Sequence, residues 1–154
     1  MSPILVRDLD PKFKDEISAL PGGENLKACF ACGTCTGGCP VSEIDERYDP
    51  RKIIRMILLG MRKEVLSSDL IWLCVTCFTC SFHCPQDVKF ADISRILRDM
   101  AVKEGYVHPS FPKLVEEVDK FTMDLRRRMI LLAVQRKQEG VEIEPQKLLE
   151  EALK

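Results

Sequence analysis

Long hydrophobic runs and an excess of one charge are both missing from this 154-residue sequence. The longest uninterrupted apolar runs, such as residues 129–134, are much shorter than the roughly 20 residues that a membrane-spanning helix needs. The formal net charge of −1 gives no electrostatic footprint for nucleic acid or for an anionic membrane. The first residues lack the basic region and the long apolar region of a secretory signal. We therefore expect a cytoplasmic protein in a reducing compartment, with no nucleic-acid partner and no direct membrane insertion.

Strand signals are also scarce, because the sequence has neither a long β-branched alternation nor an Asn-Gly hairpin turn. Helical spacing recurs instead, for example after Asp49 and Pro50, which are suitable as an N-cap and a first helical residue. Two apolar faces with this spacing are Ile53, Ile54, Ile57, Leu58 and Met61, and Phe90, Ile93, Ile96, Leu97 and Met100. Gly105 suits the end of the second helix. The sequence therefore predicts an all-α fold.

Side chains arranged for catalysis are missing as well. The sequence has no paired carboxylate set, no nucleophile with a partner base and no glycine-rich phosphate loop. The only histidines are His83 and His108, and we interpret both as structural. We therefore expect no catalytic residues, so that any chemistry belongs to a bound cofactor.

Cysteine, in contrast, is abundant and ordered. All eight cysteines belong to two copies of one pattern, C-x2-C-x2-C-x3-C-P. The first copy is Cys29, Cys32, Cys35 and Cys39 with Pro40, and the second is Cys74, Cys77, Cys80 and Cys84 with Pro85. This run is typical of bacterial ferredoxins, in which three thiolates hold one [4Fe–4S] cube and the fourth binds the other cube. The sequence therefore predicts two [4Fe–4S] clusters.

The usual crossing of ligands gives each cluster three cysteines of one run and the fourth of the other. Under this arrangement the first cluster is bound by Cys29, Cys32, Cys35 and Cys84. The second cluster is bound by Cys74, Cys77, Cys80 and Cys39. Crossed ligation would also hold the two halves of the sequence together through the cofactors.

Zinc and disulfides are the competing interpretations of these cysteines. A structural zinc site needs only four ligands, so it has no use for a third and fourth cysteine in each run. Disulfides require an oxidising compartment and usually occur in small secreted chains. A metal and sulfide assay separates these alternatives from the two-cluster interpretation.

The spacing of the two runs sets this sequence apart from small βαβ ferredoxins, whose cysteine runs lie close together. Here residues 40–73 separate the runs and carry helical patterns. We therefore expect an α-helical ferredoxin domain over residues 1–108 and a helical tail over residues 109–154. Residues 129–134 are apolar on nearly every side of a helix, which favours docking between partners over a place in a small core.

Several local expectations follow from residue type. Asn25 is a candidate N-cap for a short turn that leads into Cys29, and Asp87 is a candidate start for the helix after Pro85. Gly140 is expected to end the tail helix before Pro145 opens a short final one. The second cysteine loop is bulkier than the first, because it contains Val75, Phe78 and Phe82, whereas the first is rich in glycine. A drier shell of this kind is expected to lower the reduction potential of the second cluster.

Residues 70–85, which contain the second cysteine run, resemble the C-type iron–sulfur subunit of heterodisulfide reductase, as do residues 105–112. The resemblance extends over residues 20–112. It implies a subunit that holds two [4Fe–4S] clusters, binds no substrate and is not catalytic on its own. Such a subunit relays electrons from an A-type subunit, which carries flavin and iron–sulfur clusters, to a B-type subunit. The B-type subunit carries the clusters that reduce the heterodisulfide of coenzyme M and coenzyme B in methanogenesis, so the resemblance implies a hetero-oligomer.

The cysteine runs alone leave other functions open. They are shared with iron–sulfur subunits of succinate dehydrogenase-like, glycolate oxidase and glycerol-3-phosphate dehydrogenase complexes. The main alternative is therefore an iron–sulfur subunit of a membrane quinone-linked dehydrogenase. A freely diffusing ferredoxin and a scaffold without redox function are further alternatives. Diffusing ferredoxins are typically small and strongly acidic, whereas this sequence is near neutral.

Overall fold

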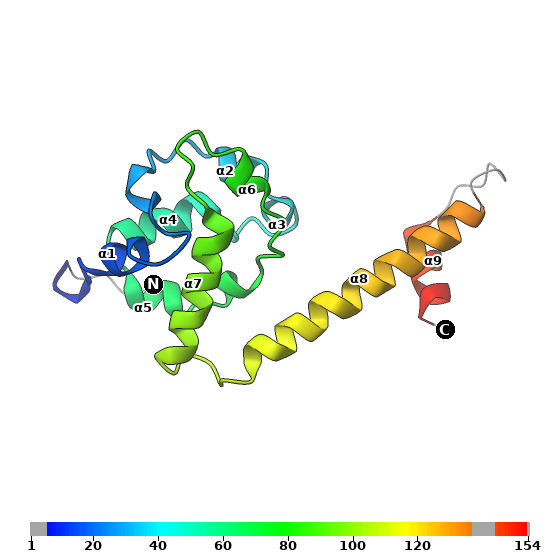
Figure 1. The fold of residues 1–154 in the computed structure, drawn as a ribbon. Helices are drawn as coiled ribbons and strands as arrows, with labels where there is room; N and C mark the ends of the chain where they lie inside the picture. Colours follow the sequence, from blue (N-terminus) through cyan, green and yellow to red (C-terminus); the bar gives the residue numbers. More distant parts are fainter. Residues whose placement is uncertain (1–5, 137–143, 154) are drawn as a thin grey trace. The chain divides into compact units, whose positions relative to one another are not determined.

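The computed structural model describes residues 6–136 and 144–153, and these residues form helices and no strand (Figure 1). The prediction of an all-α fold is therefore confirmed. The chain divides into two compact units, Met1–Pro109 and Ser110–Lys154, and all eight cysteines belong to the first. None of the helices in the described ranges combines the length and the hydrophobicity that crossing a bilayer requires.

The first unit consists of short helices that pack against the buried face of one longer helix, α7. Its α-helices are α1 (Phe13–Ser18), α2 (Thr34–Gly37), α3 (Pro40–Ile44), α4 (Pro50–Leu58), α5 (Arg62–Leu66), α6 (Thr79–Phe82) and α7 (Phe90–Lys103). Three 3-10 helices connect them: η1 (Val6–Asp8), η2 (Leu26–Ala28) and η3 (Asp69–Trp72). Helix α7 packs against α5, α6 and η3, so it contacts both the core and the second cysteine run (Figure 1).

Helix α4 begins as its sequence predicts. Asp49 is the N-cap, its carboxylate accepts a 3.0 Å hydrogen bond from the Lys52 amide, and Pro50 is the first helical residue. The helix ends at Leu58, and Gly60 then has a φ of +80°. A Cβ on Gly60 would lie 2.4 Å from the Asp10 carbonyl oxygen. Glycine is therefore needed here both for the backbone conformation and for the close approach of the N-terminal segment.

A single hydrophobic core joins α1, α4, α5 and α7. Its largest fully buried side chains include Phe13, Ile17, Leu26, Tyr48, Ile57, Leu66, Phe90, Ile93 and Leu97. The apolar faces expected on α4 and α7 supply much of this core, as their spacing predicts. Burial of each such aliphatic or aromatic side chain contributes about 1.5–3 kcal/mol. Both cysteine runs pack against this core.

Asn25 and Asp87 do not make the capping contacts that their residue types suggest. Asn25 precedes η2, but its side chain makes no capping hydrogen bond. Its amide nitrogen donates instead to the carbonyl oxygen of Asp87 at 3.2 Å and to the Asp87 carboxylate at 3.3 Å. Asp87 has a φ of +50°, and α7 begins three residues later, at Phe90. Both capping expectations are therefore wrong, because these two polar side chains connect segments 62 residues apart.

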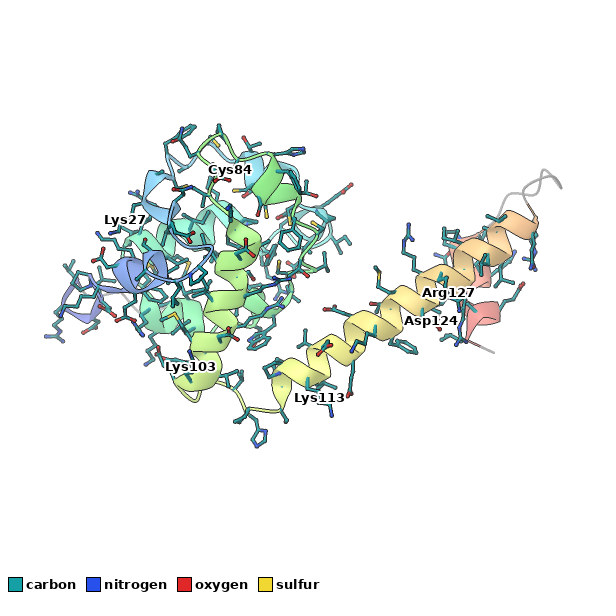
Figure 2. All side chains as sticks on the ribbon, viewed as in Figure 1. Lys27, Cys84, Lys103, Lys113, Asp124 and Arg127 are labelled. Atoms are coloured by element: carbon teal, nitrogen blue, oxygen red, sulfur yellow. The ribbon has the colours of Figure 1, made fainter. Side chains whose placement is uncertain are left out.

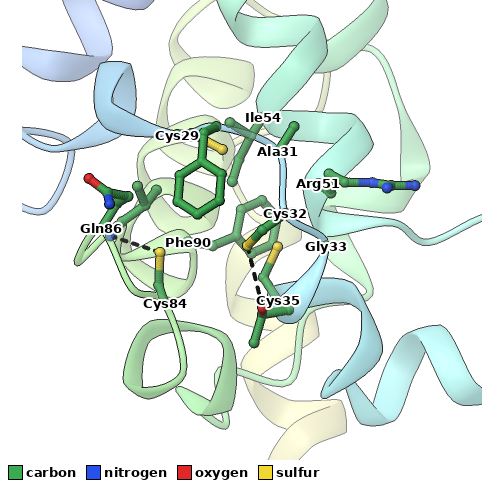
Figure 3. A pocket seen from close by; sticks show the side chains of 13 residues that line it. Cys29, Ala31, Cys32, Gly33, Cys35, Arg51, Ile54, Cys84, Gln86 and Phe90 are labelled. Atoms are coloured by element: carbon green, nitrogen blue, oxygen red, sulfur yellow. Dashed lines mark hydrogen bonds between the residues drawn. The ribbon is translucent and has the colours of Figure 1, made fainter.

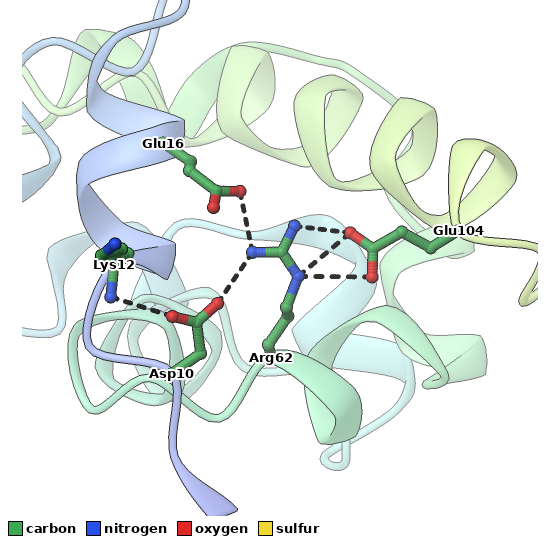
Figure 4. A network of polar contacts seen from close by, with 5 residues as sticks. All are labelled: Asp10, Lys12, Glu16, Arg62 and Glu104. Atoms are coloured by element: carbon green, nitrogen blue, oxygen red, sulfur yellow. Dashed lines mark hydrogen bonds and ion pairs between the residues drawn. The ribbon is translucent and has the colours of Figure 1, made fainter.

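Arg62 at the start of α5 connects three parts of the first unit (Figure 4). Its guanidinium lies 2.9 Å from Asp10, 2.8 Å from Glu16 on α1 and 2.6 Å from Glu104, which follows α7. The same guanidinium lies over the ring of Phe13, 5.1 Å from its centroid. These contacts fix the ends of α1, α5 and α7 at the side of the core.

The second unit pairs the long helix α8 (Phe111–Gln135) with α9 (Pro145–Ala152). Leu148 and Ala152 of α9 are buried, and Arg136 forms a 2.7 Å ion pair with Glu151. Helix α8 has no buried residue among those described, and Arg127 and Arg128 both pair with Asp124 along the helix, at 2.8 Å and 2.7 Å (Figure 2). Gly140, the expected end of the tail helix, lies outside the described residues, whereas α9 begins at Pro145 as predicted.

Candidate iron–sulfur sites

The two cysteine runs repeat each other in backbone conformation as well as in sequence. In each run the residue before the second cysteine has a positive φ, +59° at Ala31 and +48° at Thr76. The residue after the second cysteine also has a positive φ, +88° at Gly33 and +62° at Phe78. A helical turn then follows, α2 in the first run and α6 in the second, and these two turns pack against each other (Figure 1).

This backbone is unfavourable for most residues and therefore indicates a functional constraint. A left-handed conformation costs a residue with a Cβ roughly 1–3 kcal/mol. Ala31, Thr76 and Phe78 all adopt it, and all three lie between cysteines. Left-handed residues next to right-handed ones turn successive main-chain N–H groups toward one concave face, which suits an anionic group such as an iron–sulfur cluster. The repeated positive φ values of both loops are typical of such anion-binding loops.

The first pocket lies where the first run meets the segment after α6. Figure 3 shows the sulfur atoms of its four cysteines around one space. These four residues are Cys29, Cys32, Cys35 and Cys84. The remaining wall is mainly apolar, with Ile54 of α4 and Phe90 of α7, and Arg51 is at its edge. The first pocket therefore takes three cysteines from one run and one from the other.

The second pocket has the reciprocal composition. Its four cysteines are Cys39, Cys74, Cys77 and Cys80. Val41, Tyr48, Pro50, Phe78 and Ala91 are among its other lining residues. Phe90 lines both pockets and is fully buried, so its ring is a wall common to the two sites. The structure thus groups all eight sequence-predicted cysteines into two sets of four.

Hydrogen bonds reach sulfur atoms in both pockets. The Thr34 hydroxyl lies 3.3 Å from the sulfur of Cys32, and the Thr79 hydroxyl lies 3.5 Å from that of Cys77. The Val88 amide donates a 3.3 Å hydrogen bond to the sulfur of Cys84 (Figure 3). Hydrogen bonds to cluster sulfurs are one of the means by which a protein sets a reduction potential.

The thiols differ in their acidity before any metal binds. The hydrogen bond from Thr34 lowers the pKa of the Cys32 thiol, whereas burial raises the pKa of Cys35. Burial together with nearby thiols raises the pKa of Cys80 to about 11. Because the thiolate is the metal ligand, metal binding at Cys80 has to displace a proton. We therefore expect the exposed Cys32 to engage metal more readily than the buried Cys80.

Tyr48 brings a buried hydroxyl to the second pocket. Its side chain is only 1% exposed, and it lines the same pocket as Cys74. Burial, reinforced by the thiols of Cys74, Cys39 and Cys80, raises the pKa of Tyr48. The phenol therefore remains neutral at physiological pH and can donate its proton to a thiolate.

The chemistry of the two donor sets fits a [4Fe–4S] cluster at each pocket. Each set offers four soft thiols, which select iron–sulfur clusters, zinc or copper(I). No three His, Cys, Asp or Glu side chains in residues 6–136 and 144–153 have the geometry of a single-ion site. A cubane does not require that geometry, because its own irons and sulfides lie between the ligands. The mainly apolar walls would keep water away from such a cluster.

The bulky residues of the second loop cover the second pocket only in part. Phe78 and Val75 both line it, although Val75 is 52% exposed. Phe82 is 86% exposed and does not line this pocket. The expectation that the bulky residues of the second loop keep water from the second cluster is therefore wrong for Phe82, because α6 turns that side chain toward solvent.

Comparison with known proteins identifies the domain that contains these pockets. Residues 25–88 match the family model of the 4Fe-4S dicluster domain, a span that includes all eight cysteines. A relative from Methanothermobacter thermautotrophicus, the C-type subunit of its H(2):CoB-CoM heterodisulfide,ferredoxin reductase, is 40% identical over 103 residues, which are 67% of this chain and 55% of the relative. Over about two thirds of its length, this chain is thus similar to the C-type subunit of heterodisulfide reductase. The resemblance expected from the sequence is thereby confirmed.

Other proteins of this type give similar alignments. The second C-type iron-sulfur subunit of the CoB--CoM heterodisulfide reductase of Methanocaldococcus jannaschii is 44% identical over 98 residues, 64% of this chain and 52% of the relative. The C-type subunit of the Ferredoxin:CoB-CoM heterodisulfide reductase of Methanosarcina mazei is 40% identical over 96 residues, 62% of this chain and 58% of the relative. The alignments thus span little more than half the length of these relatives.

Three residues of the site could not be found from the sequence. Phe90 belongs to a helical pattern that indicates only a core, Tyr48 lies in the loop before α4, and the place of both at the pockets depends on tertiary packing. Arg98 of α7 reaches the main chain of the second run from 24 residues away. The only signal for these positions was their occurrence between or shortly after the cysteine runs.

Proposed function

We propose that this protein is the electron-transfer subunit of a heterodisulfide reductase-type complex and holds two [4Fe–4S] clusters. It would relay electrons from an A-type subunit with flavin and iron–sulfur clusters to a B-type subunit that reduces CoM-S-S-CoB or a related disulfide. The observation that carries this proposal is the pair of pockets, each with four cysteines, that share Phe90. The names of the homologues support the role of a C-type subunit.

The chain's own part in this function is to hold, insulate and separate the two redox sites. Cys29, Cys32, Cys35 and Cys84 would ligate the first cluster, and Cys74, Cys77, Cys80 and Cys39 the second. When bound, each cluster supplies one-electron chemistry without a proton donor or a substrate site. Phe90 fills the space common to both pockets and keeps water out of it. On this proposal the protein is not catalytic on its own.

The second unit would provide a docking surface for another component of the complex. Leu114, Val118 and Phe121 follow one another at helical spacing on α8, and all three are exposed. Exposed apolar side chains in such a row are typical of an interaction surface. We expect the partner to be another subunit of the complex.

The cofactor part of the proposal is tested by analysis of anaerobically purified protein. We expect about eight irons and about eight acid-labile sulfides per chain. A variant with Cys32→Ser and Cys77→Ser, which changes the equivalent ligand of both sites, should lose much of this content. Stoichiometric zinc without sulfide in the unchanged protein would overturn the two-cluster proposal.

The partner part is tested by anaerobic affinity isolation of the tagged chain from its native host at low salt. We expect a flavoprotein and a second cysteine-rich subunit with disulfide reductase activity to accompany it. Recovery of quinone-reactive membrane subunits would instead assign the chain to a membrane quinone-linked dehydrogenase. The electron-transfer role would then remain, but its acceptor would be different.

A further inference from the structure

Arg98 on α7 holds the main chain that leads into the second cysteine run. Its Nε donates to the Ile71 carbonyl oxygen at 2.9 Å, and its Nη2 donates to those of Trp72 at 3.2 Å and Cys74 at 2.7 Å. The buried Ser94 hydroxyl, one helical turn earlier, adds a 3.4 Å hydrogen bond to the Ile71 carbonyl. The planar guanidinium thus fixes the peptide of a cysteine that lines the second pocket.

The charge of Arg98 is held close to that pocket. All three of its acceptors are main-chain carbonyls, and no carboxylate forms an ion pair with it within the described residues. Its guanidinium lies 5.6 Å from the ring centroid of Trp72, and the side chain is partly buried. A cation in such a place is less screened than one in water, so it favours an added negative charge nearby.

Tyr48 is a second group that acts in this direction. Its buried phenol lines the same pocket as Cys74, the residue whose carbonyl Arg98 holds, and its hydroxyl can donate to a ligand sulfur there. A hydrogen bond to a ligand sulfur becomes stronger as negative charge builds on the cluster, and this favours the reduced state. Arg98, through the Cys74 carbonyl, and Tyr48, through its place in the pocket, thus both favour reduction of the second cluster.

The first pocket has a weaker version of this arrangement. Its cation is Arg51, whose guanidinium lies 3.9 Å from the Asp49 carboxylate and whose side chain is half exposed. The carboxylate offsets part of that charge, and solvent screens part of the rest. The first pocket is thus less able than the second to stabilise an added electron through a nearby cation.

The geometry points to Arg98 and Tyr48 as positioning residues that raise the reduction potential of the cluster at Cys39, Cys74, Cys77 and Cys80 above that of the other cluster. An electron that enters either cluster would then reside mainly on the second cluster, which has the higher reduction potential. This inference depends on the proposed function, because it requires both clusters. It reverses the order that the bulky residues of the second loop suggest.

A redox titration of the whole chain, followed by electron paramagnetic resonance, tests the inference. The equivalent single variants Cys32→Ser and Cys77→Ser assign each signal to its cluster. In the unchanged protein we expect the signal that Cys77→Ser alters to appear first as the potential is lowered. Appearance of the other signal first, or of both together, would overturn the inference.

Three substitutions identify the residues responsible. Arg98→Met removes the charge and should shift only the midpoint of the second cluster to a more negative potential. Arg98→Lys keeps the charge, so it should restore part of that midpoint, although it cannot hold three carbonyls at once. Arg55→Met is the matched control, because it removes an exposed charge from α4 at a residue that lines neither pocket. It should leave both midpoints in place.

Tyr48→Phe keeps the inference testable if Arg98→Met loses the second cluster. This variant removes only a hydroxyl, and it should also shift the second midpoint to a more negative potential. Unchanged midpoints in Tyr48→Phe, or in an Arg98→Met protein that retains both clusters, would contradict the inference. Failure of the proposed function is recognised separately, because the unchanged protein would then lack the iron and sulfide of two clusters.

Discussion

The hydroxyl of Thr34 lies 3.3 Å from the sulfur of Cys32, and the same relationship recurs between Thr79 and Cys77 at 3.5 Å. Each threonine begins the helical turn that follows its loop, α2 or α6. Each also follows a residue with positive φ. The repeat in the sequence is therefore a repeat in structure, which supplies matched positions for comparing the two sites.

The paired threonines give a prediction for reduction potentials. Thr34→Val should make the first cluster harder to reduce, and Thr79→Val should do the same for the second, because each removes a hydroxyl beside a ligand sulfur. If about 1 kcal/mol of hydrogen-bond strength is lost, the shift is on the order of 50 mV. Redox titration of both variants checks this. A shift of the same cluster in both variants would contradict the assignment of one threonine to each site.

Crossed ligation predicts which cluster depends on Cys39. Although Cys39 belongs to the first run, it lines the second pocket. Cys39→Ala should therefore damage the cluster at Cys74, Cys77 and Cys80 and preserve the other. Cys84→Ala is the matched variant and should have the reverse effect, since Cys84 lines the first pocket. Paramagnetic spectra of both variants test this. Loss of the first cluster in Cys39→Ala and of the second cluster in Cys84→Ala would disprove crossed ligation.

The sequence predicts the features of this fold that depend on local chemistry. Asp49, Pro50 and the apolar spacing after them define α4 because capping and periodicity act within one helix. The spacing on α7 and its end before Gly105 are confirmed for the same reason. The cysteine pattern identifies the dicluster domain, because four soft ligands in each run have few other uses.

Contacts between distant segments are the part that the sequence does not reveal. Asn25 and Asp87 each suit a helix N-terminus, but tertiary contact pairs them with each other. Tyr48 and Arg98 have no local motif, and their role depends on the way α7 packs against η3 and the second run. Phe82 was expected to shield the second site, yet its outward direction follows from the turn of α6. Residue type alone cannot determine such directions.

The Arg62 network predicts the kinetic stability of the first unit. Arg62→Met leaves the carboxylates of Asp10, Glu16 and Glu104 without their common partner, so they would repel one another. We expect a loss of about 1–3 kcal/mol, seen as faster bleaching of the cluster absorbance in denaturant under anaerobic conditions. Arg55→Met, which removes an exposed arginine from α4, is the control and should bleach at the original rate. Equal rates for both variants would show that the network does not stabilise the unit.

The division into two units predicts that the tail can be removed without loss of the clusters. Residues 110–154 form their own compact unit, and none of the eight cysteines lies in it. A chain ending at Pro109 should keep its iron and sulfide but recover far less of its partners in an anaerobic affinity isolation.

A double substitution on α8 then distinguishes docking from a role in folding. Val118→Glu with Phe121→Ala changes the exposed apolar row and should weaken partner recovery at least tenfold, while the iron content stays constant. Lys120→Ala is the control, because it removes only an exposed ion pair with Glu116 on the same helix. If the shortened chain lost both clusters, the tail would be needed for the fold of the first unit. If the double variant recovered its partners normally, the docking surface would have to lie away from this row, since the substitutions change its charge and its apolar area together.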